Sequence, residues 1–92
     1  MTEMTLCKRI IVQGRVQRVG FRKTTLKISR NYSVCGYVQN LPTGEVLIVA
    51  QGQGDVLDKF LNQLRQEMGS LIASIQEEPM NLQDFKEFQI QY

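Results

Sequence analysis

Two short segments contain the residue types and spacings that could carry out chemistry. The first, residues 14–22 with the sequence GRVQRVGFR, is a basic loop bracketed by Gly14 and Gly20 that ends on Arg22. Because glycine reaches backbone angles that other residues avoid, the amides of such a loop can converge on one phosphate, with the positive end of a following helix behind it. The planar guanidinium of Arg22 could then hold two phosphoryl oxygens. The segment therefore predicts a phosphate-binding loop.

The second segment has the sequence GYVQN and ends on Asn40. Its carboxamide offers an acceptor and two donors, enough to hold a water beside a bound phosphoryl group. With a good leaving group and a loose transition state, positioning and charge stabilisation suffice without a general base. Together the segments suggest a small enzyme that directs water at a phosphoryl group. Each also has an ordinary structural interpretation, a solvated turn for the loop and a turn former for Asn40, and the residues alone leave both open.

The cysteine and histidine content excludes several other chemistries. The chain has no histidine, so histidine catalysis is excluded, and it has only Cys7 and Cys35, with no Cys-x-x-Cys pair for a zinc site. Neither cysteine has an arginine six residues later, so the spacing of cysteine phosphatases is absent. Both cysteines lie in apolar, strand-like runs, where we expect buried free thiols rather than a disulfide scaffold. We expect no metal and no cofactor.

Charge is distributed unevenly along the chain. Residues 1–30 carry eight basic side chains and one acidic one, a balance of +7, whereas residues 31–92 carry three basic and eight acidic side chains, a balance of −5. Such a gradient favours a localised anion-binding face over general attraction to polyanions. The predicted strands also lack the clustered exposed aromatic residues that stack on RNA bases, so we expect no nucleic-acid partner.

The residue pattern around the two segments predicts the elements that position them. Alternating Ile and Val before the loop indicates a strand with Ile10 and Val12 on its buried face. A Pro/Gly turn between two strand patterns indicates a hairpin, and three- and four-residue apolar spacing after it indicates an amphipathic helix. The expected elements are a strand at 7–13, the loop at 14–20, a helix at 21–31, a turn at 31–33, a strand at 34–41, a turn at 42–44, a strand at 45–51, a helix at 55–68, a strand at 71–75, a loop at 79–83 and a strand at 85–92.

Individual residues are assigned to the ends and faces of these elements. Asp55 is expected to cap the second helix and Gly69 to end it. In the last strand, Phe88, Ile90 and Tyr92 are expected to alternate inward. The helix residues expected to contact the core are Phe21, Leu26, Ile28, Val56, Leu57, Phe60, Leu61 and Leu64.

The element order predicts an α+β fold, the ferredoxin-like α/β sandwich (β-α-β-β-α-β). It has an antiparallel sheet with two helices on one face, and here a short C-terminal edge strand is added. Residues 1–92 leave room for a single domain. No apolar run approaches the roughly 20 residues that span a bilayer, and the first residues lack the pattern of a signal peptide. We therefore expect a cytoplasmic protein without a membrane partner. We also expect a monomer, because every predicted apolar face has a partner within the sandwich.

At these residues the chain resembles the acylphosphatase family. The resemblance runs from about Lys8 to Tyr92 and rests on the motifs GRVQ, VGFR and GYVQNL, with Gly44 and Val46 after them, on QG before the second helix and on the ending FQIQY. It implies a small cytosolic enzyme that hydrolyses the carboxyl–phosphate bond of acyl phosphates to a carboxylate and inorganic phosphate. The family needs neither a metal nor a covalent intermediate.

The resemblance also implies roles for individual residues. By position, Arg22 resembles the phosphate-binding arginine of the family, and Asn40 resembles the asparagine that orients the attacking water. The phosphate-cradling loop corresponds to Arg15, Val16, Gln17, Arg18, Val19 and Gly20.

Two positions depart from the family pattern. Arg18 stands where the family usually has glycine, and if the position needs a positive φ, arginine costs about 1 kcal/mol there. Arg18 could tilt an amide away from the phosphate, or it could point outward and attract the dianion. The alternative function is therefore a non-catalytic phosphate- or anion-binding module whose loop is impaired by Arg18. The second departure, Gln91, replaces an arginine of many relatives and does not touch the proposed chemistry.

Overall fold

A computed structural model describes residues 4–92 of the chain. Residues 1–3, on which the expectation about a signal peptide partly rested, lie outside the described residues. Within the described part, no helix is long and apolar enough to cross a bilayer. The elements are β1 (Thr5–Gly14), α1 (Phe21–Ser29), β2 (Cys35–Asn40), β3 (Val46–Gln53), α2 (Gly54–Met68), a short 3₁₀ turn (Gly69–Leu71), β4 (Ile72–Met80) and β5 (Phe88–Gln91).

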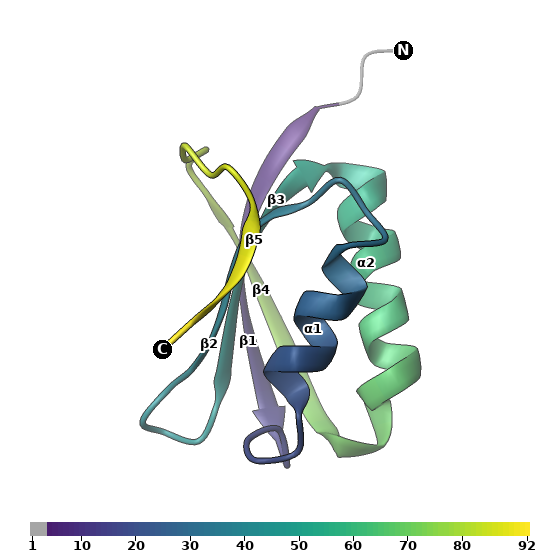
Figure 1. The fold of residues 1–92 in the computed structure, drawn as a ribbon, viewed down its shortest axis with the longest axis vertical. Coiled ribbons are helices and arrows are strands. Elements are labelled where there is room, and N and C mark those ends of the chain that lie inside the picture. The colour runs from purple at the N-terminus through teal and green to yellow at the C-terminus, as the bar shows by residue number, and fades with distance from the viewer. Residues whose placement is uncertain (1–3) are drawn as a thin grey trace.

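The five strands form one sheet in the order β4-β1-β3-β2-β5. The pairs β1–β3, β1–β4 and β2–β3 are antiparallel, and both helices lie against the same face of the sheet (Figure 1). The predicted ferredoxin-like sandwich is confirmed. Its edge strand β5 pairs with β2 in parallel, so the complete sheet is mixed.

The core lies between the helices and this face of the sheet. Ile10 and Val12 of β1 are fully buried there, as their alternation predicts. The apolar stripe of α2 is buried against them, and the ring of Phe60 meets that of Phe88 edge to face at 5.8 Å between centroids. Full burial of one such side chain contributes roughly 1.5–3 kcal/mol, so this layer supplies most of the stability. Of the core residues predicted on the helices, only Leu26 and Val56 are half-buried rather than buried.

The opposite face of the sheet carries a smaller apolar cluster around Cys7, Leu47 and Val49. Cys7 and Cys35 are both free, as predicted, but only Cys7 is buried and Cys35 is half-buried. Both are register partners of Gln51 on either side of β3, so they lie two strand spacings apart, about 10 Å, beyond the reach of a disulfide. Burial raises the pKa of both thiols, and the negative charge of a Cys35 thiolate would raise that of Cys7 further.

Two predicted boundaries were wrong because strand pairing continues further than the residue pattern indicates. β3 stays paired with β1 as far as Gln53, so α2 begins at Gly54, and Asp55 lies in its first turn instead of capping it. β4 pairs with β1 as far as Met80, although residues 79–83 were predicted to be a loop. Pro79 is tolerated because β4 is an edge strand, where one N–H needs no partner.

Two smaller details also differ from expectation. α2 ends at Met68 as predicted, but Gly69 keeps right-handed angles (φ −59°) and continues into the 3₁₀ turn. β5 ends at Gln91, so the prediction of an inward-facing Tyr92 was wrong: this side chain is 90% exposed.

Candidate active site

The loop between β1 and α1 lies at the same end of the sheet as the β2–β3 turn (Figure 1). Its first residue, Gly14, has φ 134°, and a Cβ there would lie 2.6 Å from the backbone nitrogen of Ala73. Only glycine therefore fits against the start of β4. The next amide, of Arg15, donates a hydrogen bond to the carbonyl oxygen of Leu71 at 2.8 Å. Together these two residues fix the loop entrance to β4.

The backbone of the rest of the loop is free to bind a ligand. No described residue accepts a hydrogen bond from the amides of residues 16–20. Gly20 has φ 78° and caps α1, whose first turn follows directly. The Val16 side chain is buried and anchors the loop to the core. Open amides beside a helix N-terminus are the arrangement that binds a phosphate.

A hollow of about 250 Å³ opens beside this loop. Its lining includes both Arg22 and Asn40, although they are 18 positions apart in the chain. Arg15, Gln17 and Val19, which the sequence also assigned to the cradle, are not among the lining side chains. The lining residues are Val16, Arg18, Gly20, Phe21, Arg22, Lys23, Asn40, Ile90 and Tyr92.

Arg22 lies in the first turn of α1, half-buried at the wall of the hollow. The central carbon of its guanidinium lies 5.1 Å from the centroid of the Tyr92 ring, a cation–π contact. The contact restricts where the guanidinium can point. The sequence predicted Tyr92 as an inward-facing residue of the last strand. Its position beside Arg22 could not be predicted, because no local residue pattern indicates that β5 pairs with β2 in parallel.

Asn40 is the last residue of β2. Its Oδ1 atom is buried and accepts no hydrogen bond from any residue in the described part of the chain. Leaving a buried polar atom unpaired costs about 1–3 kcal/mol. Because Asn40 lines the hollow, a water or ligand placed there could satisfy this oxygen.

The Gln17 side chain ties the loop to the β2–β3 turn. Its Nε2 donates to the carbonyl oxygens of Leu41, at 2.8 Å, and Glu45, at 2.9 Å. Leu41 directly follows Asn40, so this carboxamide fixes the spacing between the loop and the asparagine. The sequence placed Gln17 in the cradle but contained no signal for this clamp, which depends on how two distant segments meet.

Comparisons with known proteins agree with this geometry. The acylphosphatase family model matches residues 8–90. The chain is 34% identical to an acylphosphatase from Archaeoglobus fulgidus over 84 residues, which cover 90% of this chain and 94% of the relative. It is 38% identical to one from Petrotoga mobilis over 88 residues, 95% of this chain and 99% of the relative. It is also similar to the crystal structure of acylphosphatase from Bacillus subtilis, with a TM-score of 0.86, 29% identity and coverage of 97% and 100% of the two chains.

The family model and the relatives each cover nearly the whole chain, and the structural likeness covers 97% of it. The chain therefore belongs to the acylphosphatase family, whose enzymes hydrolyse acyl phosphates.

Proposed function

We propose that the protein hydrolyses acyl phosphates by in-line attack of a water held by Asn40, without a metal ion or a covalent intermediate. One observation carries this proposal: a single hollow contains the half-buried guanidinium of Arg22 and the buried, unpaired Oδ1 of Asn40. A cation for the phosphoryl group and an acceptor for a water thus line the same hollow. These are the two functions that the reaction requires.

The loop and Arg22 bind the phosphoryl group in this mechanism. Its oxygens accept hydrogen bonds from the amides of residues 16–20, and Arg22 holds two of them through its planar fork. The N-terminus of α1 adds roughly half a positive charge behind the site. The contact with Tyr92 keeps the guanidinium in place before the substrate arrives. Hydrogen-bond donors that are already in position therefore stabilise the charge that develops on the phosphoryl oxygens.

Asn40 positions the water. Oδ1 accepts a hydrogen bond from it, which aims the water oxygen at phosphorus. The new bond from water to phosphorus forms as the bond from phosphorus to the carboxyl oxygen breaks, and the electron pair leaves with the carboxylate. A carboxylic acid has a pKa of about 4, so this group leaves without being protonated. The water proton ends on inorganic phosphate.

The test is hydrolysis of benzoyl phosphate with a metal chelator present, followed by loss of ultraviolet absorbance. Asn40→Ala should lower kcat roughly 100-fold, since removal of one positioned polar group from such a site commonly costs that much. Inhibition by inorganic phosphate should stay nearly unchanged, because the cradle and Arg22 remain. Arg22→Ala should lose both activity and phosphate inhibition.

Asn81→Ala and Arg30→Ala serve as matched controls, because both residues are exposed and outside the lining of the hollow. Neither should change turnover. Full turnover by a folded Asn40→Ala protein would disprove the role given to the asparagine, and dependence on an added metal would disprove the mechanism.

The alternative function is a non-catalytic anion-binding module, in which Arg18 impairs the loop. Arg18 has φ 64°, so a residue other than glycine holds a left-handed turn within the cradle. If this tilts an amide away from the phosphoryl group, phosphate binds but no acyl phosphate is cleaved. Arg18→Gly should then create activity that the natural sequence lacks.

We also propose that the chain acts as one domain and as a monomer. The apolar faces of both helices are packed against the sheet, and the opposite face is partly covered by Phe85 through its edge contact with Tyr37. Light scattering coupled to size exclusion should give a mass near 10.6 kDa. A stable dimer would contradict this.

A further inference from the structure

The hollow contains more positive charge than a phosphoryl group needs. Its lining includes Arg18, Arg22 and Lys23 but no acidic side chain. None of the three forms an ion pair with an acidic side chain of the described residues, whereas Lys8, Arg9 and Arg65 elsewhere do. The three cations of the hollow are thus available to a ligand.

The charge balance indicates a second anionic group on the substrate. A phosphoryl group carries about two negative charges at neutral pH. Arg22, one further cation and the partial charge at the N-terminus of α1 balance them. The side chains that line the hollow then retain about one positive charge, which one carboxylate would balance.

The positions of the cations indicate where that group lies. Arg22 is half-buried, whereas Arg18 and Lys23 are exposed and so lie toward the mouth of the hollow. With the phosphoryl group in the cradle, the acyl part of the substrate extends toward this mouth. A carboxylate at the far end of the acyl group would therefore meet Arg18 and Lys23.

The backbone of Arg18 supports a role for its side chain. Its φ of 64° lowers the stability of the fold by about 1 kcal/mol, a cost that glycine at this position would avoid. Backbone strain of this kind clusters at active sites and ligand clamps, where it can be part of the function. The guanidinium fork also matches a carboxylate in two parallel hydrogen bonds.

We propose that Arg18, supported by Lys23, makes the site selective for acyl phosphates of dicarboxylic acids, whose acyl group carries a second carboxylate. This inference rests on the proposed function, since it assumes that the phosphoryl group occupies the cradle. The effect is one of specificity. The second carboxylate strengthens binding, and the chemistry at phosphorus is the same for both substrate types.

Binding of two phosphonates that cannot be hydrolysed separates this selectivity from turnover. Benzylphosphonate and (4-carboxybenzyl)phosphonate differ only in the carboxylate, and their Kd values can be measured by calorimetry. The carboxylated compound should bind five- to tenfold more tightly, the effect of one charge-assisted hydrogen bond discounted for exposure. Arg18→Gln should remove most of this ratio, and Arg18→Lys should keep part of it.

Arg30→Gln is the matched control, because it removes the same charge at the other end of α1. It should leave the ratio unchanged, and 1 M salt should reduce the ratio for the natural sequence. Equal Kd values for the two phosphonates, or the same ratio in Arg18→Gln, would overturn the inference. Hydrolysis of benzoyl phosphate is measured in parallel. A selective protein without turnover would disprove the proposed function and leave the selectivity standing.

Discussion

Arg18 is the one non-glycine residue of the described chain with a positive φ, 64°. In this conformation, steric crowding between the side chain and the backbone costs about 1 kcal/mol of stability. Arg18→Gly should therefore raise the free energy of unfolding, by up to about 1 kcal/mol, although the greater freedom of glycine in the unfolded chain offsets part of the gain. Urea unfolding followed by circular dichroism measures the change.

Arg15→Gly is the control for this comparison. It lies in the same exposed loop without a positive φ, so glycine there only increases the freedom of the unfolded chain. This variant should be less stable than the natural protein. If both variants moved in the same direction by the same amount, the strain assigned to Arg18 would be refuted.

The functional residues differ in how far the sequence could predict them. Arg22 and Asn40 could be predicted because their types suit the chemistry and each lies at the end of a recognisable element. The strain at Arg18 could be predicted conditionally, and its φ of 64° meets the condition. The clamp of Gln17 and the contact of Tyr92 with Arg22 could not, because both join segments whose distance is set by tertiary packing.

At the scale of elements, the Gln17 clamp couples the β1–α1 loop to the β2–β3 hairpin. Gln17→Ala leaves the carbonyl of Leu41 without this donor and frees the loop from the turn that follows Asn40. We expect kcat for benzoyl phosphate to fall about tenfold, because a displacement of the loop relative to Asn40 misaligns water and phosphoryl group. Steady-state kinetics on the folded variant test this.

Gln17→Glu should be more damaging than Gln17→Ala, because a carboxylate would then face two carbonyl oxygens. Gln89→Ala, at an exposed position on β5, provides the matched control and should keep full activity. An unchanged kcat in both Gln17 variants would show that the clamp does not position the site.

The order and type of the elements could be predicted from periodicity and turn residues, whereas their ends could not. β4 and β3 extend beyond their apolar patterns because β1 supplies hydrogen-bond partners along its whole length, up to the pairs Thr5↔Gln53 and Cys7↔Met80. Hydrogen bonding to β1 therefore determines where β3 and β4 end. The parallel pairing of β5 also depends on a free edge of β2, and no local residue pattern predicts this pairing.

At the scale of the whole molecule, ion pairing separates the basic residues of β1 from those of the loop. Lys8 Nζ lies 3.1 Å from Glu77 Oε1, and Arg9 lies 3.6 Å from Glu78, so acidic residues of β4 neutralise the cations of β1. The cations that line the hollow have no such partners among the described residues. Arg18, Arg22 and Lys23 thus keep unneutralised positive charge at the hollow, whereas the cations of β1 are paired.

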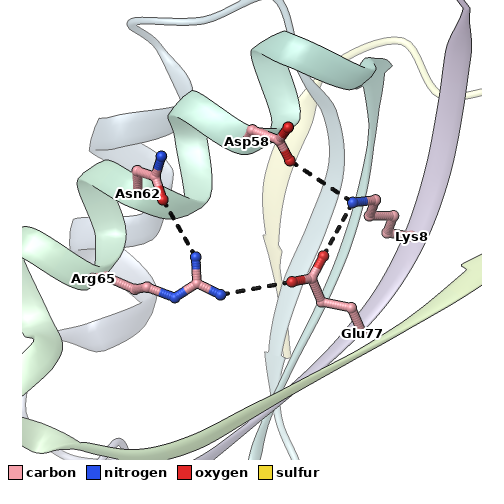
Figure 2. A network of polar contacts seen from close by, with 5 residues as sticks. All are labelled: Lys8, Asp58, Asn62, Arg65 and Glu77. Atoms are coloured by element: carbon pink, nitrogen blue, oxygen red, sulfur yellow. Dashed lines mark hydrogen bonds and ion pairs between the residues drawn. The ribbon is translucent and has the colours of Figure 1, made fainter.

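Glu77 also joins three elements into one network (Figure 2). Its carboxylate on β4 meets Lys8 of β1 at 3.1 Å and Arg65 of α2 at 3.6 Å. Lys8 further approaches Asp58 at 4.0 Å, and Arg65 donates to Asn62 at 3.4 Å. Because the charges share partners, holding one side chain in place also orders the next.

Glu77→Gln should lower the free energy of unfolding by about 1 kcal/mol at low salt, the upper end for partly exposed pairs, because two cations lose their shared carboxylate. Glu78→Gln, the neighbouring control, breaks a single exposed pair and should cost about half as much or less. In 1 M salt, where the screening length is about 3 Å, the two variants should become nearly equal in stability. Urea unfolding at both salt concentrations decides the matter. An equal loss at low salt would mean that Glu77 acts as an ordinary surface charge, and that its network adds no stability beyond that of one exposed pair.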